Sequence, residues 1–324
     1  MTGKRRVLVT GGCGFIGGHL VGKLVEWGED LVILDNLSKG KADNIRGLLA
    51  LSKLKLIVGD LLDISKVEEA VRDCELVFHL AANPEVRAGY KDPELDFKQN
   101  IVATYNLLEA MRKSPYARTL VFTSTSTVYG DAAKIPTPEN YGPLIPISLY
   151  GASKLSCEAL TSAYAHLFGI RATIFRFANV VGPGGHGVVQ DLMCKLETNP
   201  KELEVLGDGT QTKSYMYIGD CIEAMLHGLE RSEDVVSIFN IGSDDQIDVR
   251  SIARIVIEEM GLRNASIRFT GGVDGGRGWK GDVKKMLLDI SRIRGTGWEP
   301  RYSSEESIKL TVRATRRGSL RVGK

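Results

Sequence analysis

The segment TGGCGFIGG, at positions 10–18, constrains the fold of this chain more than any other feature. A short apolar run, RRVLVT at 5–10, precedes it, and apolar residues at helical spacing follow it from Phe15 to Trp27. Gly11, Gly14 and Gly17 have the spacing that permits a tight turn, close approach of a pyrophosphate and close helix–strand packing. A helix beginning here points free N–H groups at that pyrophosphate, so the segment predicts a dinucleotide site.

Further apolar runs alternate with helical spacing through the first half of the chain. Continuous apolar runs of this kind are typical of strands buried on both faces of a parallel sheet. They are LVILD at 31–35, LKLIVGD at 54–60, ELVFHLAA at 75–82, RTLVFTSTS at 118–126 and IRATIFRFAN at 170–179. The alternation predicts an α/β fold, a Rossmann-type doubly wound parallel sheet.

The pattern changes after Asn179. Two glycine-rich stretches, VVGPGGHG and TGGVDGGRGWKGD, are poor core material but can wrap a ligand. We therefore expect a second, smaller α/β substrate lobe beside the cofactor domain. The predicted bounds are 1–176 plus 213–241 for the cofactor domain and 177–212 plus 242–324 for the substrate domain.

Composition excludes several classes of protein. A net charge of +2 gives no reason to expect nucleic acid as a partner. No run approaches the roughly 20 apolar residues of a membrane helix. The five cysteines are scattered and lack the spacing of a zinc site, so we expect no metal. Reduced thiols and the absence of a leader pattern predict a cytoplasmic protein.

The choice of dinucleotide depends on Asp35. This residue ends the second apolar run, about 20 residues after the glycine-rich turn, where a carboxylate binds the ribose hydroxyls. The same carboxylate would repel a 2′-phosphate, so NAD is predicted in preference to NADP.

A tyrosine and a lysine supply the candidate acid–base pair. Tyr150 and Lys154, in YGASK, are four residues apart and so share one face of a helix. A lysine ammonium and a positive nicotinamide would favour the phenolate, which could take a proton from a sugar hydroxyl. The hydroxyls at 123–127 lie at the end of a predicted strand, where open α/β sheets bind their ligands.

These motifs together resemble the UDP-glucose 4-epimerase family, within the sugar-nucleotide epimerase/dehydratases. The resemblance runs from about residue 5 to about residue 310. It rests on TGGCGFIGG, VILDN, GDLLD, HLAANPEVR, STSTVYG, YGASK, FRFANVVGP, LGDGTQTKSYMYIGD and RGWKGD.

The resemblance implies roles for individual residues. Thr125 would bind the reacting hydroxyl beside Tyr150 and Lys154. The NAD contacts would come from Gly11, Gly14, Phe15, Ile16, Gly17, Asp35, Asn36, Asp60, Leu61, Leu80, Ala81, Ala82, Asn100, Thr123, Tyr150, Lys154 and Phe177. The UDP-sugar contacts would come from Asn83, Thr125, Asn179, Val188, Val189, Leu206, Lys213, Arg277, Asp282 and Met286. Lys213 replaces a frequent arginine, which keeps the charge but loses the bidentate fork.

The reaction follows from what is missing beside Thr125. The family's dehydratases carry an Asp-Glu pair after this threonine, and its decarboxylases carry a glutamate before VYG; here these positions hold Ser126 and Thr127. Epimerisation at C4 of UDP-glucose and UDP-galactose, by hydride removal and return, is therefore expected. UDP-N-acetylglucosamine or UDP-glucuronate epimerisation, and a non-catalytic NAD-binding sensor or scaffold, are the alternatives. Segments 97–112 and 149–168 resemble the family's four-helix contact, which implies a homodimer.

Overall fold

The computed structural model describes residues 5–49, 53–262 and 264–322. Within these ranges the chain forms two compact units. The first unit comprises residues 1–128, 149–176 and 226–239, and the second comprises 129–148, 177–225 and 240–324. Segments 129–148, 213–225 and 240–241, which were predicted to lie in the cofactor domain, lie in the second unit. The boundary between the two units falls within helix α9 (Ile218–Glu230), between Met225 and Leu226.

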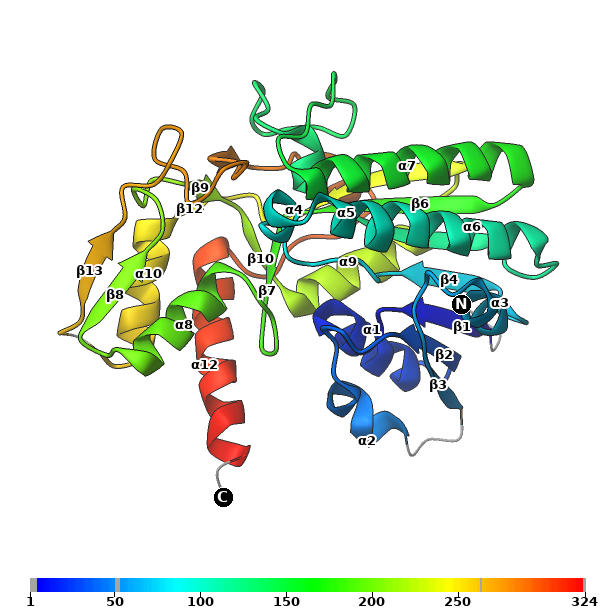
Figure 1. The fold of residues 1–324 in the computed structure, drawn as a ribbon, viewed down its shortest axis with the longest axis horizontal. Helices are drawn as coiled ribbons and strands as arrows, with labels where there is room; N and C mark the ends of the chain where they lie inside the picture. Colours follow the sequence, from blue (N-terminus) through cyan, green and yellow to red (C-terminus); the bar gives the residue numbers. More distant parts are fainter. Residues whose placement is uncertain (1–4, 50–52, 263, 323–324) are drawn as a thin grey trace. The chain divides into compact units, whose positions relative to one another are not determined.

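A seven-stranded sheet forms the centre of the first unit, with strand order β11-β6-β5-β4-β1-β2-β3 (Figure 1). Its strands are β1 (Arg6–Thr10), β2 (Asp30–Asp35), β3 (Leu54–Val58), β4 (Leu76–His79), β5 (Thr119–Thr125), β6 (Arg171–Phe177) and β11 (Val236–Ile241). Val9 at the centre of β1 pairs in parallel with Ile33 of β2 and Phe78 of β4. The predicted doubly wound sheet is confirmed, and its order reverses between β1 and β4, where such folds bind ligands.

Helices cover this sheet. They are α1 (Phe15–Glu26), η1 (Ala42–Ile45), α2 (Arg46–Leu49), α3 (Ile64–Val71), α4 (Ala88–Lys91), α5 (Pro93–Asp96), η2 (Phe97–Val102), α6 (Ala103–Lys113), η3 (Ser126–Tyr129) and α7 (Leu149–Phe168). Helix α6 packs between α3 and α7, and its buried leucines join the core beneath β1 and β2 (Figure 1). The predicted helix at 97–112 is confirmed, but its first turn, η2, is a π-helix.

Short strands and three long helices form the second unit. The strands are β7 (Asn179–Val181), β8 (Glu202–Val205), β9 (Thr212–Lys213), β10 (Tyr215–Tyr217), β12 (Ile247–Asp248), β13 (Ser266–Phe269) and β14 (Lys285–Met286). The helices are α8 (Val188–Thr198), α10 (Val249–Glu259), α11 (Ser291–Arg294) and α12 (Ser304–Val322). Helices α8, α10 and α12 pack on one another around an aliphatic core (Figure 1). None of the helices in the described ranges is long and apolar enough to cross a membrane.

Candidate active site

The glycine-rich turn has the geometry of a phosphate site. Gly11 has a φ of +69°, and a Cβ there would lie 2.7 Å from the main-chain nitrogen of Ala81. A Cβ on Gly17 would overlap the carbonyl oxygen of Gly11. Helix α1 begins at Phe15, and its N-cap residue Gly14 makes no side-chain capping hydrogen bond. The N–H of Ile16, in the first turn of α1, lies where a helix N-terminus binds an anionic group.

Asp35 holds this turn as well as marking the end of β2. Its Oδ2 accepts a hydrogen bond from the N–H of Cys13 at 2.9 Å, and its Oδ1 accepts one from Leu37 at 2.8 Å. The carboxylate is 7% exposed. Asp35, which is predicted to bind the ribose, is thus hydrogen-bonded to the loop that is predicted to bind the pyrophosphate. The spacing of these residues in the sequence could not show this connection.

The predicted adenosine residues are also connected. The side-chain amide of Asn36 donates to Oδ2 of Asp60 at 2.7 Å, and Gln99 donates to the same oxygen at 3.3 Å. Leu61 is buried beside Asp60. Gln99 was missed by the sequence analysis, because it lies 39 residues away on the π-helical turn.

The segment after β4 lies against the glycine-rich turn. The N–H of Leu80 donates to the carbonyl of Thr10 at 3.2 Å, and that of Ala81 donates to the Thr10 hydroxyl at 3.3 Å. Ala82 follows them, partly buried. These contacts place the predicted cofactor residues of β1 and β4 on neighbouring strands at the sheet's carboxyl edge.

Thr125, Tyr150 and Lys154 belong to the same unit. Thr125 ends β5, and its hydroxyl lies 3.1 Å from that of Thr127. Tyr150 is the second residue of α7, one turn before Lys154. The Lys154 ammonium is buried, donates to the carbonyl of Thr123 at 2.8 Å and lies 4.7 Å from the Phe122 ring centroid. Helix α7 packs directly on β5.

Burial shifts the ionisation of the acid–base pair. Removal from water raises the pKa of the Tyr150 phenol, and the charge of Asp96 raises it further. Burial also lowers the pKa of Lys154 to about 8, although nearby anions oppose the change. The protein alone thus raises the phenol pKa, whereas the expected lowering also includes the positive charge of the nicotinamide.

A buried ion pair fixes α7 to the sheet. Arg176 of β6 donates to both carboxylate oxygens of Glu158, with a closest distance of 2.7 Å. Both side chains are at most 5% exposed, and Ser124 also donates to Glu158. Glu158 follows Lys154 by one turn, so the pair holds the helix face that carries Lys154.

The predicted substrate residue Asn83 and cofactor residue Asn100 contact each other. The N–H of Asn83 donates to Oδ1 of Asn100 at 2.8 Å. Both side-chain amides also bind the buried carboxyl group of Asp96, and Asn100 reaches Ser153 on α7. Both were missed: Asp96 lies outside every motif, and Ser153 lies within YGASK, where only Tyr150 and Lys154 were assigned a role.

The second unit contains the remaining predicted substrate residues. Two of them, Lys213 and Arg277, form ion pairs with carboxylates. Lys213 pairs with Oδ1 of Asp282 at 2.6 Å and lies 5.5 Å from the Trp279 ring centroid. Arg277 forms a bidentate pair with Asp131, with a closest distance of 2.8 Å, and also donates to the carbonyl of Asp282. Asp131, which the sequence analysis did not include, lies 146 residues from its partner.

The other predicted residues of this unit differ in exposure. Met286 is 7% exposed and pairs with Lys213 between β14 and β9. The side chain of Val189 packs in the core around α8, with Val188 at the core's margin. The side-chain amide of Asn179 donates to the carbonyl of Ser214 at 3.1 Å. The carbonyl of Leu206 accepts a hydrogen bond from Gln211 at 3.2 Å. Phe177 is buried.

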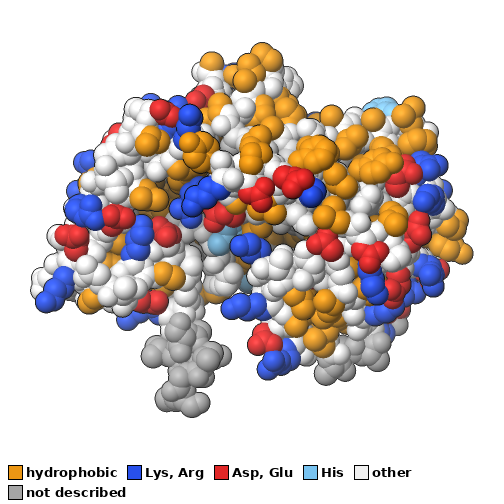
Figure 2. All heavy atoms as spheres, in the orientation of Figure 1, with side chains coloured by type: hydrophobic (Ala, Val, Ile, Leu, Met, Phe, Trp, Pro, Cys, Tyr) orange, Lys and Arg blue, Asp and Glu red, His pale blue; other side chains and the backbone are white. Residues whose placement is uncertain are grey.

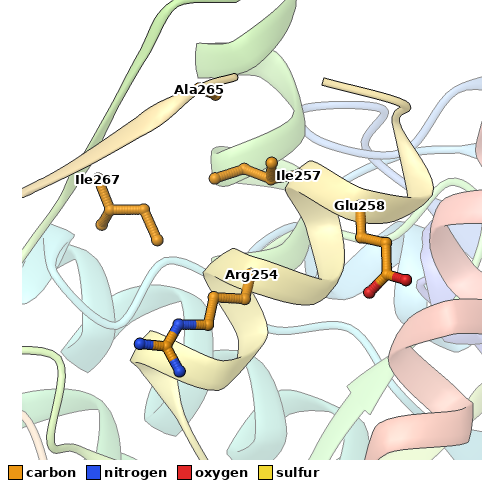
Figure 3. A pocket seen from close by; sticks show the side chains of 5 residues that line it. All are labelled: Arg254, Ile257, Glu258, Ala265 and Ile267. Carbon is orange, nitrogen blue, oxygen red and sulfur yellow. The ribbon is translucent and has the colours of Figure 1, made fainter. Parts of the chain in front are cut away.

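One open pocket of the second unit carries none of this chemistry. Arg254, Ile257 and Glu258 of α10 line one side, and Ala265 and Ile267 line the other (Figure 3). In the described ranges, no group of three or more His, Cys, Asp or Glu side chains could hold a metal ion. The candidate chemistry is therefore that of the glycine-rich turn and the Tyr150–Lys154 pair.

Comparisons with known proteins agree with this geometry. Residues 7–242 match the NAD dependent epimerase/dehydratase family. A solved UDP-galactose 4-epimerase is 43% identical, with a TM-score of 0.86, over 97% of this chain and 99% of that one. A UDP-glucose 4-epimerase of Thermotoga maritima, solved with UDP-glucose, is 34% identical, with a TM-score of 0.86, over 97% and 99% of the two chains.

A third similar structure contains the cofactor. The UDP-glucuronic acid 4-epimerase of Bacillus cereus, solved with UDP-glucuronic acid and NAD, is 30% identical. Its TM-score is 0.85, and the match covers 96% of this chain and 99% of that one. The resemblance expected from the motifs is confirmed: this chain belongs to the NAD dependent epimerase/dehydratase family, and its cofactor is NAD.

Proposed function

We propose that this protein is a UDP-hexose 4-epimerase that interconverts UDP-glucose and UDP-galactose. The observation that carries the proposal is the combination of an intact Tyr150–Lys154 pair with hydroxyls beside Thr125. The two positions where the related dehydratases and decarboxylases carry acids hold Ser126 and Thr127. Proton removal from C5 and loss of CO₂ are thus left without the expected carboxylate, whereas oxidation and reduction at C4 need none.

Tyr150 moves the proton in the proposed reaction. Bound NAD supplies the chemistry of hydride acceptance from C4 and hydride return. Tyr150 takes the O4 proton as the C4–H bond breaks, which leaves a 4-keto sugar. After the sugar turns over, hydride reaches the other face of C4 and Tyr150 gives the proton back to O4. No net proton or electron is consumed, and Lys154 stabilises the phenolate as a cation at neutral pH.

The UDP moiety provides the affinity, because a sugar that turns over cannot be held tightly. Lys213 and Arg277 are the proposed cations for the diphosphate. Each is paired with a carboxylate, Asp282 or Asp131, in the protein alone. Binding of a diphosphate would therefore exchange these partners rather than neutralise unpaired charges.

Two other functions remain alternatives to be tested. The similarity to a UDP-glucuronic acid 4-epimerase supports that substrate, and the flexible Met286 side chain supports some turnover of UDP-N-acetylglucosamine. A sensor that binds NAD without catalysis is disfavoured by the intact Tyr150, Lys154 and Thr125.

We also propose a cytoplasmic location, since all five cysteines are free thiols.

We further propose a homodimer formed through α6 and α7. Large apolar side chains are exposed along these helices and the turns before them, and Figure 2 shows hydrophobic side chains gathered over this side of the first unit. They are Tyr90, Phe97, Tyr105, Leu149, Leu167 and Phe168. Light scattering should give twice the mass of one chain. A monomer at micromolar concentration would overturn this part of the proposal.

The test of the proposed function is a side-by-side NMR time course with UDP-galactose, UDP-N-acetylglucosamine and UDP-glucuronate. Purified protein is first denatured in a separate sample to identify released NAD. We expect UDP-galactose to reach equilibrium with UDP-glucose fastest. Preference for either other sugar would favour that alternative, and no conversion of any sugar by the NAD-loaded protein would favour the sensor.

A further inference from the structure

Asp96 is a buried carboxyl group beside the catalytic helix. It ends α5, is 1% exposed, and has a raised pKa because burial disfavours its charged form. Its Oδ1 accepts hydrogen bonds from the side-chain amides of Asn83 at 2.9 Å and Asn100 at 3.3 Å. Its Oδ2 is buried and has no hydrogen-bond partner among the described residues. Such a group is costly to bury, so its place in the fold calls for an explanation.

A continuous set of hydrogen bonds leads from Asp96 to Tyr150. The side-chain oxygen of Asn100 accepts from the N–H of Asn83, which fixes the orientation of the Asn100 amide. The Asn100 nitrogen then donates to Oγ of Ser153 at 2.8 Å. Ser153 in turn donates to the main-chain carbonyl of Tyr150 at 2.8 Å. Three hydrogen bonds therefore connect the Asp96 carboxyl group to the backbone of the catalytic residue.

The position of Tyr150 makes such support necessary. Tyr150 is the second residue of α7, and the first turn of a helix lacks part of its internal hydrogen bonding and tends to fray. Asn100 lies in a π-helical turn, which is a rare structure that is often found at functional sites. Its hydrogen bond to Asp96 joins this turn to the residue just before it.

Gly89, on helix α4, lies close to both Asp96 and the beginning of α7. A Cβ at this position would lie 3.1 Å from Cβ of Leu149, the first residue of α7, and would overlap Oδ2 of Asp96. Asp96 and the first residue of α7 thus both lie close to Gly89, and helix α5, which Asp96 ends, contacts α7.

We propose that Asp96 is a positioning residue that holds the first turn of α7, and with it Tyr150, through Asn100 and Ser153. It need not touch the substrate or the reacting atoms. The kinetic part of its test rests on the proposed epimerase function, whereas the structural part does not.

Kinetics of two Asp96 variants test the role directly. Asp96→Ala removes the shared acceptor and should lower kcat about 10²-fold, the effect of a misplacement of roughly 1 Å. Asp96→Asn keeps an oxygen for both amides and should restore most of kcat. The control Asp92→Ala alters an exposed carboxylate four residues earlier and should behave as wild type. Wild-type kcat in Asp96→Ala, or an equal loss in Asp96→Asn, would overturn the proposal.

A double-mutant cycle tests the path through Ser153. If Asp96 acts through Ser153, Ser153→Ala should lower kcat, and the double variant should be no slower than the slower single variant. Losses that multiply would overturn the proposed path. Should Asp96→Ala fail to fold, Asp96→Ser, which is too short to reach both amides, replaces it in both experiments.

Hydrogen–deuterium exchange separates this proposal from the proposed function. Peptides covering residues 149–157 should exchange faster in Asp96→Ala than in wild type, and Asp96→Asn and Asp92→Ala should match wild type. This result is expected even if no UDP-sugar is turned over, in which case only the proposed function fails. Unchanged exchange in Asp96→Ala would overturn the positioning role whatever the activity.

Discussion

In the proposed mechanism Tyr150 must lose its proton at neutral pH, yet the protein around it favours the neutral phenol. Burial and the Asp96 carboxyl group both raise its pKa. The compensating charges are Lys154, whose pKa burial lowers to about 8, and the positive ring of bound NAD. In the proposed mechanism the positive ring of NAD adds to the charge of Lys154, so we expect the phenolate to form more readily in the loaded enzyme.

The first prediction concerns this phenol. Tyr150→Phe should lower kcat by about 10²–10⁴-fold, the usual contribution of a positioned acid–base group. Bound NAD, measured after denaturation, should stay at the wild-type level, because the glycine-rich turn and Asp35 are untouched. A variant that kept more than about a tenth of wild-type kcat, against a typical loss of at least 10²-fold, would show that another group moves the proton.

A second prediction concerns the buried His79. Its ring contacts the hydroxyls of Thr10 at 2.8 Å and Thr104 at 2.9 Å, and burial lowers its pKa from 6.5 to about 3. The unfolded chain thus binds a proton between these values and the folded chain does not. The free energy of unfolding should fall as pH drops through this window, by up to about 1.4 kcal/mol per pH unit from this group.

Urea unfolding across this window measures the effect. His79→Asn cannot titrate, so its unfolding free energy should depend less steeply on pH than that of the wild type. The exposed His19 provides the control, and His19→Asn should keep the wild-type slope. Equal slopes for all three proteins would mean that His79 titrates normally in the folded state.

At the scale of elements, α7 depends on the buried pair between Glu158 and Arg176. Arg176→Met should destabilise the protein by about 3–5 kcal/mol, because it leaves a buried carboxylate without its partner. Lys98→Met breaks the exposed pair with Glu94 and should cost at most about 1 kcal/mol. Chemical denaturation of both variants provides the comparison. Similar losses in the two would show that the buried pair does not brace the helix.

The strands and most helices of the first unit could be predicted because their apolar runs are long and buried on both faces. The predicted strand at 31–35, for example, lies within one residue of β2. The π-helical turn at 97–102 was not predicted, and neither were the hydrogen bonds that its Asn100 side chain makes to Asp96 and Ser153 of other elements. Periodicity reports which face is buried, but it does not report how a turn is bonded.

For the whole molecule, motifs predicted the types of residue that carry the chemistry but not their partners. Asp35 was predicted from its place after a strand, whereas its hydrogen bond to Cys13 depends on the folded turn. The pairs Lys213–Asp282 and Arg277–Asp131 join residues 69 and 146 positions apart. Such long-range pairs leave no local signal in a single sequence.

Sugar specificity is the prediction that belongs to the whole molecule. Met286 is proposed to lie near C2 of the sugar, where a flexible side chain can move aside for an N-acetyl group. Met286→Tyr should remove turnover of UDP-N-acetylglucosamine and spare UDP-galactose. Because Met286 is 7% exposed, equal falls in kcat/KM for both sugars would instead mark it as a packing residue.

The central claim is that hydride leaves C4 and returns to the same carbon. The most direct test follows UDP-galactose labelled with deuterium at C4, incubated with the NAD-loaded protein in ordinary water. The account predicts UDP-glucose that keeps the label at C4, with no solvent hydrogen incorporated. Loss of the label to water during epimerisation, or no UDP-glucose at all, would contradict it.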